Sequence, residues 1–401
     1  MNRLMATGAA ALLFATTSVR AEQLTWVEDL SAPDSATYQF TDVRVIGADV
    51  YMSGYARSGL AGFVWKRIGG VWSDMNISNV SFVNSIHGTS GSDLWVGGNS
   101  GVHHYDGANW SGVAAGVGQE VKNIVAIDAS NVVALGAGGS IRQTVNGGIA
   151  WTTISGGNGG TTVGLFANAT DDIWIGGNDG QSYMEHWDGA SYDVTPGYTS
   201  PGSFVQAIFQ NGTNIYASGT GGEAWRWDAG TMAFVSINYM WNNFASARDV
   251  VVDDSGDAWF VGDRSHVFHY DGDTGAYDLQ DSAIIPNGVT KKNSGNNSYT
   301  SIAIHNNNVN LIVVGSDGVW EAEIPIVVPF QVAFSNITVS DTIGFQFASE
   351  QGSNYVLQCS SNGATYVSKN FTIHGQGIPD EITFDPNGYD SNKTYRIIIA
   401  E

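Results

Sequence analysis

Short runs of alternating apolar and polar residues, separated by glycine-rich turns, repeat along most of the chain. In one such unit, residues 92–97 alternate, residues 98–101 have turn chemistry, residues 102–105 form a second run, and Asp106-Gly107 precedes Trp110. Alternation with a period of two predicts β-strands joined by tight hairpins. No stretch after the first 21 residues keeps a helical period, so the sequence predicts an all-β protein.

These units share an Asp or Asn that is followed five residues later by a Gly. The pairs are Asp49/Gly54, Asp93/Gly98, Asn131/Gly136, Asp172/Gly177, Asn214/Gly219, Asp257/Gly262 and Asn310/Gly315. A spacing of about 40 to 45 residues, which tolerates insertions, indicates stacked supersecondary units. With a further apolar run before each Asx residue, every unit supplies about four strands, which predicts a seven-bladed β-propeller.

The last unit is short of one strand. Pro325 and Pro329 interrupt the chain after its third apolar run, and a proline cannot donate to a sheet ladder. A propeller must close, because its end blades would otherwise expose sheet edges. Residues 24–30 offer such a strand ahead of the first unit. We therefore expect the N-terminal strand to complete the last blade.

The two ends of the chain differ from the repeats. Arg3, the apolar residues 4–19 and the small-x-small triplet ending at Ala21 predict a signal peptide over residues 1–21. We expect a secreted or periplasmic protein, with the propeller over 22–328. Residues 329–401 carry six alternating runs and predict a small β-sandwich. Cys359, the single cysteine, is interpreted as a small apolar residue in one of these strands.

The net negative charge of the chain disfavours some classes of binding partner. The formal net charge of -22 argues against nucleic acid or an anionic membrane as a partner. No stretch after the leader has the roughly 20 apolar residues of a membrane helix. We expect a monomer that engages a protein or a glycan, with no membrane insertion, no metal and no cofactor.

Several units resemble the D-x-W-x-V-G and Y/W-D-G blades of exported bacterial propellers. The resemblance rests on Asp93 to Gly98 with His104 to Gly107, on Asp172 to Gly177 with His186 to Gly189, and on Asp257 to Gly262 with His269 to Gly272. Residues 144–151 are similar to the Asp-box turn of sialidase-like propellers, with Asn146 and Ala150 in place of its Asp and Thr. The resemblance implies a propeller fold and says nothing of chemistry. Residues 343–358 resemble short C-terminal β-modules of exported bacterial proteins, which implies an accessory role.

Histidines and aspartates of the repeats suggest metal ligands at first sight. His104, His186, His269 and the matching Arg226 stand in different blades, so they cannot converge on one ion. We interpret them as structural residues that pack between blades or bond a backbone carbonyl. The four aspartates that follow are interpreted as turn residues bonding their own backbone: Asp106, Asp188, Asp228 and Asp271.

Candidate binding residues lie where the units differ. The first strand of each blade lies next to the propeller axis, and its opening residues face the channel mouth; charged residues there are Asp42, Arg44, Lys122, Arg248 and Asp249. Such a ring suits a carboxylate-bearing or hydroxyl-rich ligand, or else its charges pair with each other. Tyr239 and Trp241, in the connection between the fifth and sixth blades, are candidates for stacking on a sugar or gripping a peptide, or else for covering the blade junction.

No catalytic residue is assigned. The R-I-P-like motif that opens the sialidase family is absent, and so are the Ser-His-Asp, P-loop, Rossmann and zinc-protease signatures. The leading hypothesis is an exported, non-catalytic binding or scaffolding propeller. The alternatives are a carbohydrate-active enzyme, such as a glycoside hydrolase or lyase, with its site at the channel mouth, and a structural component of a cell envelope or matrix.

Overall fold

The computed structural model describes residues 24–324 apart from short segments, and six strands between 335 and 400. The segments outside the description are 60, 119, 155–160, 179–181, 195–203, 238–245, 273–274, 280–297, 306–309 and 317. The predicted signal peptide therefore lies outside the described residues. Contacts divide the chain into two compact units, and the larger unit is Ala21–Pro325.

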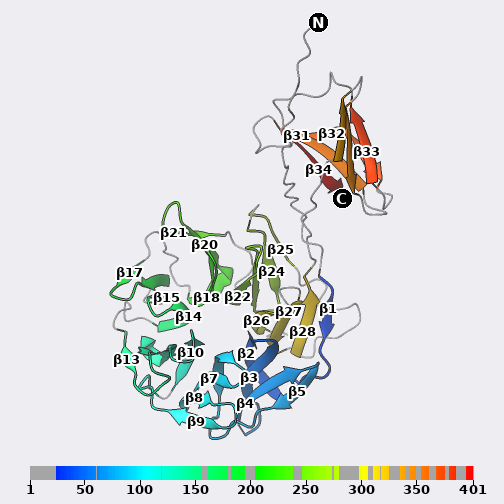
Figure 1. The fold of residues 1–401 in the computed structure, drawn as a ribbon. Coiled ribbons are helices and arrows are strands. Elements are labelled where there is room, and N and C mark those ends of the chain that lie inside the picture. Colours follow the sequence, from blue (N-terminus) through cyan, green and yellow to red (C-terminus); the bar gives the residue numbers. More distant parts are fainter. Residues whose placement is uncertain are drawn as a thin grey trace. The chain divides into compact units, whose positions relative to one another are not determined.

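The larger unit is a seven-bladed β-propeller, in which seven four-stranded antiparallel sheets surround a central axis (Figure 1). The innermost strands of blades 1 to 7 are β2 (Tyr38–Ile46), β6 (Val83–Ser90), β10 (Val121–Ala126), β14 (Thr161–Ala169), β18 (Val205–Asn211), β22 (Ala247–Val252) and β26 (Tyr299–His305). The second strands are β3 (Asp49–Ala56), β7 (Asp93–Gly98), β11 (Val132–Gly136), β15 (Asp172–Asn178), β19 (Asn214–Gly219), β23 (Ala258–Gly262) and β27 (Asn310–Gly315).

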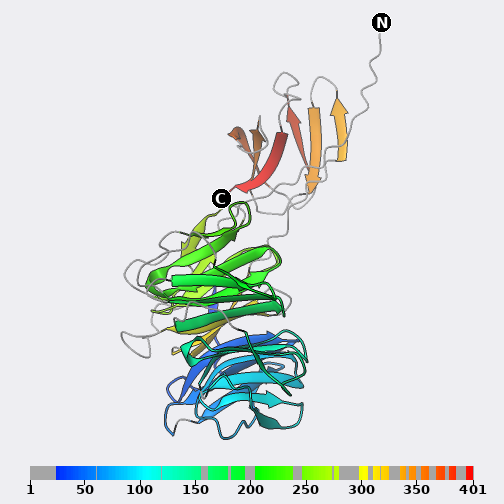
Figure 2. The ribbon, with the colours of Figure 1, turned by 90° about the vertical axis from the view of Figure 1, so that its left-hand side faces the viewer.

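Two further strands complete each blade toward the rim. The third strands are β4 (Gly62–Ile68), β8 (Gly101–Tyr105), β12 (Ile141–Thr144), β16 (Ser182–Trp187), β20 (Ala224–Asp228), β24 (Val267–Tyr270) and β28 (Gly318–Glu323). The outermost strands are β5 (Val71–Asp74), β9 (Trp110–Val113), β13 (Thr152–Thr153), β17 (Tyr192–Val194), β21 (Ala233–Ser236), β25 (Tyr277–Leu279) and, in blade 7, β1 (Trp26–Glu28). Figure 2 shows the blades edge-on, as layers of short strands.

The N-terminal strand closes the ring, as the sequence predicts. β1 pairs antiparallel with β28, so that Trp26 lies opposite Ala322 and Glu28 opposite Trp320. Trp26 is buried in the core between blades 6 and 7. Closure removes an unpaired edge from the last blade.

The recurring glycines have a steric cause. An added Cβ at Gly54 would lie 2.0 Å from the carbonyl oxygen of Gln39, and one at Gly262 would lie 1.9 Å from that of Ser246. In both blades the chain enters the inner strand directly over this glycine. Only a residue without a side chain permits that approach, so the glycine recurs with the blade.

The core consists of seven apolar clusters, one between each pair of neighbouring blades. The cluster between blades 1 and 2, for instance, holds Ile46 and Val64 from blade 1 with Ile86 and Leu94 from blade 2. The second strand of each blade is largely buried between neighbouring sheets, whereas outermost strands such as β5 and β9 are mostly exposed.

The smaller unit contains two three-stranded antiparallel sheets. One has the order β29 (Ser335–Val339), β30 (Ile343–Ala348), β33 (Pro379–Phe384), and the other has the order β32 (Val367–His374), β31 (Asn354–Ser360), β34 (Thr394–Ala400). Cys359 lies on β31. The packing of these sheets as a sandwich stays a prediction.

Helical structure is scarce in the described residues. It consists of two three-residue 3-10 turns, Ala137–Gly139 and Thr220–Gly222. No helix among the described residues is long and apolar enough to cross a membrane. The all-β prediction is confirmed.

Candidate functional site

All seven inner strands carry a β-bulge close to their first residues. In β2 the register shifts between Phe40 and Asp42, and β6, β10, β14, β18, β22 and β26 shift at the matching place. A bulge re-aims the side chains that follow it. The residues directly after the bulge, in blade order, are Asp42, Ser85, Asn123, Gly164, Ala207, Asp249 and Ser301.

Four of these residues join their own blade to the next one. Asp42 Oδ2 accepts the backbone N–H of Ile86 at 2.9 Å, and Ser85 Oγ accepts that of Ile124 at 3.4 Å. Asp249 Oδ2 accepts the N–H of Ile302 at 3.2 Å. Ser301 Oγ accepts the N–H of Val43 at 3.2 Å. Each bond satisfies a donor on the inner edge of a sheet, where no further strand is available. We call these four side chains the axial latch residues.

The bulge residues themselves add a second set of bonds between blades. Thr41 donates to the carbonyl oxygen of Val83 at 2.7 Å, Asn84 to that of Val121 at 2.8 Å, and Thr300 to that of Phe40 at 3.0 Å. Together with the latch residues, these bonds hold the inner strands of blades 7, 1, 2 and 3 in fixed register.

Three of the predicted site residues meet in one buried cluster. Arg44 Nε lies 3.3 Å from Asp42 Oδ1, and the hydroxyl of Ser301 lies between the two carboxylates, 2.9 Å from Asp42 Oδ1 and 2.7 Å from Asp249 Oδ2. Asp42 and Asp249 are 4% and 6% exposed, whereas the Arg44 side chain is 24% exposed. Arg44 therefore offsets only one of the two carboxylate charges inside the ring.

Burial dominates the protonation chemistry of this cluster. It raises the pKa of Asp249, an effect that the Arg44 guanidinium opposes and the Asp42 carboxylate adds to. Burial together with the nearby Arg44 lowers the pKa of His87 to about 4. Neutral His87 accepts the backbone N–H of Ala126 at Nδ1, 3.2 Å away. His87 thus acts as one more link between blades 2 and 3.

The other predicted site residues do not join the cluster. Lys122 and Arg248 are bulge residues that pair locally, Lys122 with Glu120 and Arg248 Nε with Asp263 Oδ1 at 2.6 Å. Tyr239 and Trp241 lie outside the described residues. The structure thus brings together three of the five charged residues that the sequence places at the channel mouth. A ligand role for any of the seven residues stays a prediction.

Sequence reasoning missed Ser301, Ser85 and His87, which complete the axial network. The signal that finds them is their place relative to the bulge. Ser85 and Ser301 directly follow it, as Asp42 and Asp249 do, and His87 lies two residues later, as Arg44 does.

The histidines of the repeat are structural, but their partner is a carboxylate. Nε2 of His104 lies 2.7 Å from Asp93 Oδ1, and the imidazole stacks on Trp95 with ring centroids 4.1 Å apart. His186 with Asp172, and His269 with Asp257, repeat this arrangement. The prediction of a backbone carbonyl holds for Arg226, which donates to the oxygen of Gly272 at 3.4 Å.

Asp106, Asp188 and Asp228 bond the backbone of their own turns, as the sequence predicts. Asp106 Oδ1 accepts the N–H groups of Ala108 and Asn109, and Asp188 does the same in its hairpin. These hydrogen bonds lower the pKa of both carboxyls. In the Asp-box-like segment, Thr144 Oγ1 and Asn146 Oδ1 accept N–H groups of the same turn. Among the described residues no group of three His, Cys, Asp or Glu side chains is placed to hold a metal ion.

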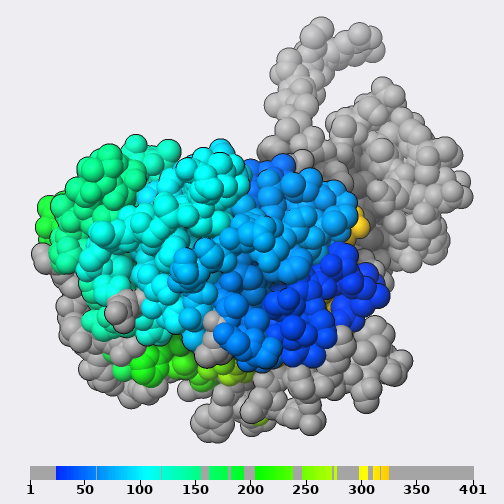
Figure 3. Space-filling model, turned by 90° about the horizontal axis from the view of Figure 1, so that it is seen from below, coloured from blue at the N-terminus to red at the C-terminus, as the bar shows by residue number. Residues whose placement is uncertain are grey.

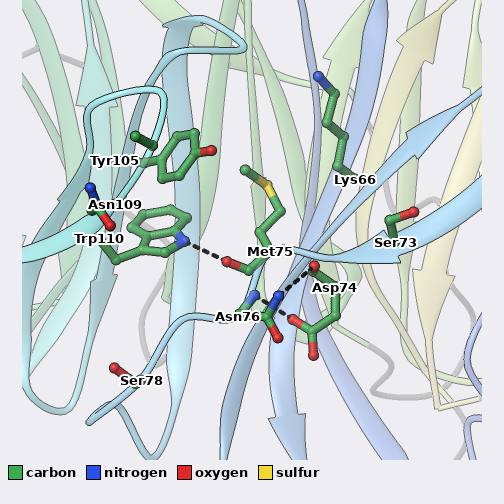
Figure 4. A pocket seen from close by; sticks show the side chains of 10 residues that line it. Lys66, Ser73, Asp74, Met75, Asn76, Ser78, Tyr105, Asn109 and Trp110 are labelled. Carbon is green, nitrogen blue, oxygen red and sulfur yellow. Dashed lines mark hydrogen bonds between the residues drawn. The ribbon is translucent and has the colours of Figure 1, made fainter.

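A cleft with a volume of about 540 Å³ opens between the outer parts of blades 1 and 2 (Figure 4). Lys66 and Ser73 line it from β4 and β5, and Tyr105 and Trp110 line it from the β8–β9 hairpin. The Trp110 indole N–H donates to the carbonyl oxygen of Met75 at 3.1 Å, across the interface between the two blades. Seen from below, blades 1 and 2 form adjoining parts of one surface (Figure 3).

The cleft exists because blade 1 presents polar side chains at this place. Lys66 and Ser73 are cross-strand neighbours on the face of blade 1 that turns to blade 2. The Lys66 ammonium lies 2.8 Å from Asp49 Oδ2 and 5.4 Å from the ring centre of Tyr51. Neither residue fills the space in front of Tyr105 and Trp110, so the two sheets stay apart at their outer strands.

Comparison with known proteins shows the fold. No family model matches the chain, and no curated protein matches it. Among solved structures, YCF48 bound to D1 peptide is similar at a TM-score of 0.58 and 13% identity, over 77% of this chain and 97% of that one. The WD40 propeller domain of Doa1 is similar at 0.55 and 12%, over 74% and 96%. PorZ, a surface component of the type IX secretion system of Porphyromonas gingivalis, is similar at 0.56 and 14%, over 90% and 59%.

Proposed function

We propose that this chain is an exported, non-catalytic propeller that binds a protein partner through the face on which the connections between blades emerge. The observation that carries the proposal is the engagement of the axial polar groups. Asp42, Arg44, Asp249 and Ser301 bond one another and the backbone of adjacent blades. Groups committed to holding a ring together do not offer an acid, base or nucleophile to a substrate.

The fold supports a binding role. Propellers with a similar fold include YCF48, which was solved with D1 peptide, and PorZ, which is named as a surface component of a secretion system. The predicted signal peptide supports export. The acidic composition favours a partner with a basic surface, because long-range attraction then speeds the encounter.

A photo-crosslinking amino acid placed on each face in turn tests the proposal. Ser100 lies in the turn between β7 and β8, on the proposed binding face, and Ala129 lies in the turn between β10 and β11, on the opposite face. Both residues are exposed. In the producing cells we expect one discrete protein adduct from position 100 and none from position 129, and no turnover of polysaccharides by the purified protein. Equal adduct patterns from both positions, or turnover of a polysaccharide, contradict the proposal.

A further inference from the structure

The cleft between blades 1 and 2 combines a rigid aromatic wall with a polar rim. Trp110 and Tyr105 form the wall, with ring centres 5.1 Å apart and planes 41° apart. The hydrogen bond from the Trp110 indole to Met75 fixes the orientation of the larger ring. An aromatic side chain held in this way binds a ligand without losing further rotamer freedom.

The rim carries short side chains with exposed hydrogen-bonding groups. Asn109 holds its hairpin turn through its backbone, by donating its N–H to Asp106 Oδ1 at 2.8 Å, so its side-chain amide stays exposed at the cleft. Asp74 and Asn76 form a second turn at the opposite side, where Asp74 Oδ1 accepts the N–H of Asn76 at 2.8 Å. Amide and carboxylate groups offer both donors and acceptors in fixed planes.

The charges of the cleft disfavour an anionic ligand. Its one lysine, Lys66, is held by Asp49, and the Asp74 carboxylate is exposed. An anionic ligand would therefore meet repulsion from Asp74 and from a protein of net charge -22. Peptide anchors favour apolar pockets, whereas most residues lining this cleft end in polar groups. A ring with one apolar face and several hydroxyl groups matches both the wall and the rim.

We propose that the cleft between blades 1 and 2 binds a neutral oligosaccharide, with a sugar ring on Trp110 and its hydroxyl groups bonded to Asn109, Asn76 and Asp74. The volume of about 540 Å³ falls within the usual range of small-molecule sites, about 300 to 1,000 Å³. Met75, Asn76 and Ser78 line the cleft from the connection between blades 1 and 2, so the site borders the face proposed for the protein partner.

Titration of the mature protein with a panel of neutral, acidic and basic oligosaccharides tests the site, by calorimetry and by tryptophan fluorescence. We expect at least one neutral oligosaccharide to bind and to change the fluorescence. Asn109→Ala should weaken that binding about tenfold, the loss of one well-placed hydrogen-bonding group. Ser191→Ala is the matched control, because Ser191 occupies the same position in the hairpin that follows Asp188.

A second pair of variants blocks the cleft. Ser73→Phe places a bulky ring in the cleft and should abolish binding, whereas Ser111→Phe, at an exposed position of β9, should leave the affinity unchanged within about twofold. Thermal melting of both variants reports whether they fold. Binding that survives Ser73→Phe overturns the proposal, as does a panel in which no neutral oligosaccharide binds. The crosslink from position 100 does not depend on these results, so failure of the glycan site and failure of the protein-binding function are separable.

Discussion

The two halves of this propeller hold their inner strands together in different ways. Around blades 7, 1, 2 and 3, side chains such as Asp42 and Ser301 reach across to the backbone of the next blade. In blades 4 and 5 the matching positions are Gly164 and Ala207, which have no polar side chain. Two residues further along, Phe166 and Phe209 pack with ring centres 5.5 Å apart. Hydrogen bonds hold the inner strands together in one half, and apolar packing holds them together in the other.

The difference follows from how an edge strand can be satisfied. The inner strand of every blade has donors that face the axis, where no further strand lies. Blade 6 shows what happens when the neighbouring latch is missing. Because blade 5 has Ala207, the N–H of Val250 is accepted by its own neighbour Asp249, at 2.9 Å. The same carboxylate also reaches forward to Ile302 in blade 7. Asp249 therefore makes the first hydrogen bond of the latched half, from blade 6 to blade 7.

The largest effect should come from removing a latch carboxylate that also balances a buried charge. Asp42→Ala leaves the Arg44 guanidinium without its closest partner and the Ile86 N–H without an acceptor. We expect the free energy of unfolding to fall by about 3 to 5 kcal/mol, measured by urea denaturation. Asp228→Ala, at an exposed hairpin turn of the unlatched half, is the control and should cost much less. Similar losses in the two variants would mean that the latch does not stabilise the ring.

Acid should weaken the latched half through His87. Its pKa is about 4 in the folded protein and about 6.5 in the unfolded chain, so the unfolded chain takes up the proton first as the pH falls. The stability lost in this way begins near pH 6.5 and is complete below about pH 4. Between pH 7 and pH 5 we expect a loss of about 2 kcal/mol, seen as a falling midpoint in urea.

His87→Gln separates this effect from other acid-sensitive groups. Glutamine keeps an acceptor for the N–H of Ala126 but does not titrate. The variant should lose less stability between pH 7 and pH 5 than the parent protein. An unchanged pH dependence would show that His87 is not the group responsible. His103, whose pKa is also lowered by burial, contributes in the same direction and remains in both proteins.

The sequence predicts the seven-bladed propeller better than it predicts the hydrogen bonds of the axial latch residues. The seven Asx/Gly pairs gave the number of blades, because six of the seven glycines lie close against a backbone carbonyl of their own unit. The missing strand of the last unit predicted the closure by residues 24–30, and the pairing of Trp26 with Ala322 confirms it. Both inferences depend on information that lies inside one repeat or at the chain ends.

The axial latch residues and the cleft both depend on contacts between repeats. The spacing of residues along the sequence does not encode such contacts. Ser301 and Asp42 are separated by 259 residues and meet only because the ring closes. The histidine partners were missed at shorter range, since Asp93 and His104 lie on adjacent strands of one hairpin and bond side chain to side chain. The cleft is the least predictable feature, because it results from the space that Lys66 and Ser73 leave unfilled.

The smallest expected effect comes from adding a hydrogen-bonding side chain at an inner-strand position that lacks an axial latch residue. A Cβ at Gly164 would meet Val205 Cγ1 at 3.4 Å and Ile208 Cγ1 at 3.5 Å, which is ordinary contact, so a side chain fits there. Gly164→Ala should stabilise slightly by restricting the unfolded chain. Gly164→Ser places a hydroxyl where Ser301 has one and should add about 0.5 to 1 kcal/mol beyond the alanine variant, because it can accept the N–H of Ile208. The difference between the two variants in urea unfolding isolates the hydrogen bond from the entropy. If Gly164→Ser is no more stable than Gly164→Ala, the inner strands of the apolar half need no further hydrogen-bond acceptor. The two halves then differ in chemistry but not in stability.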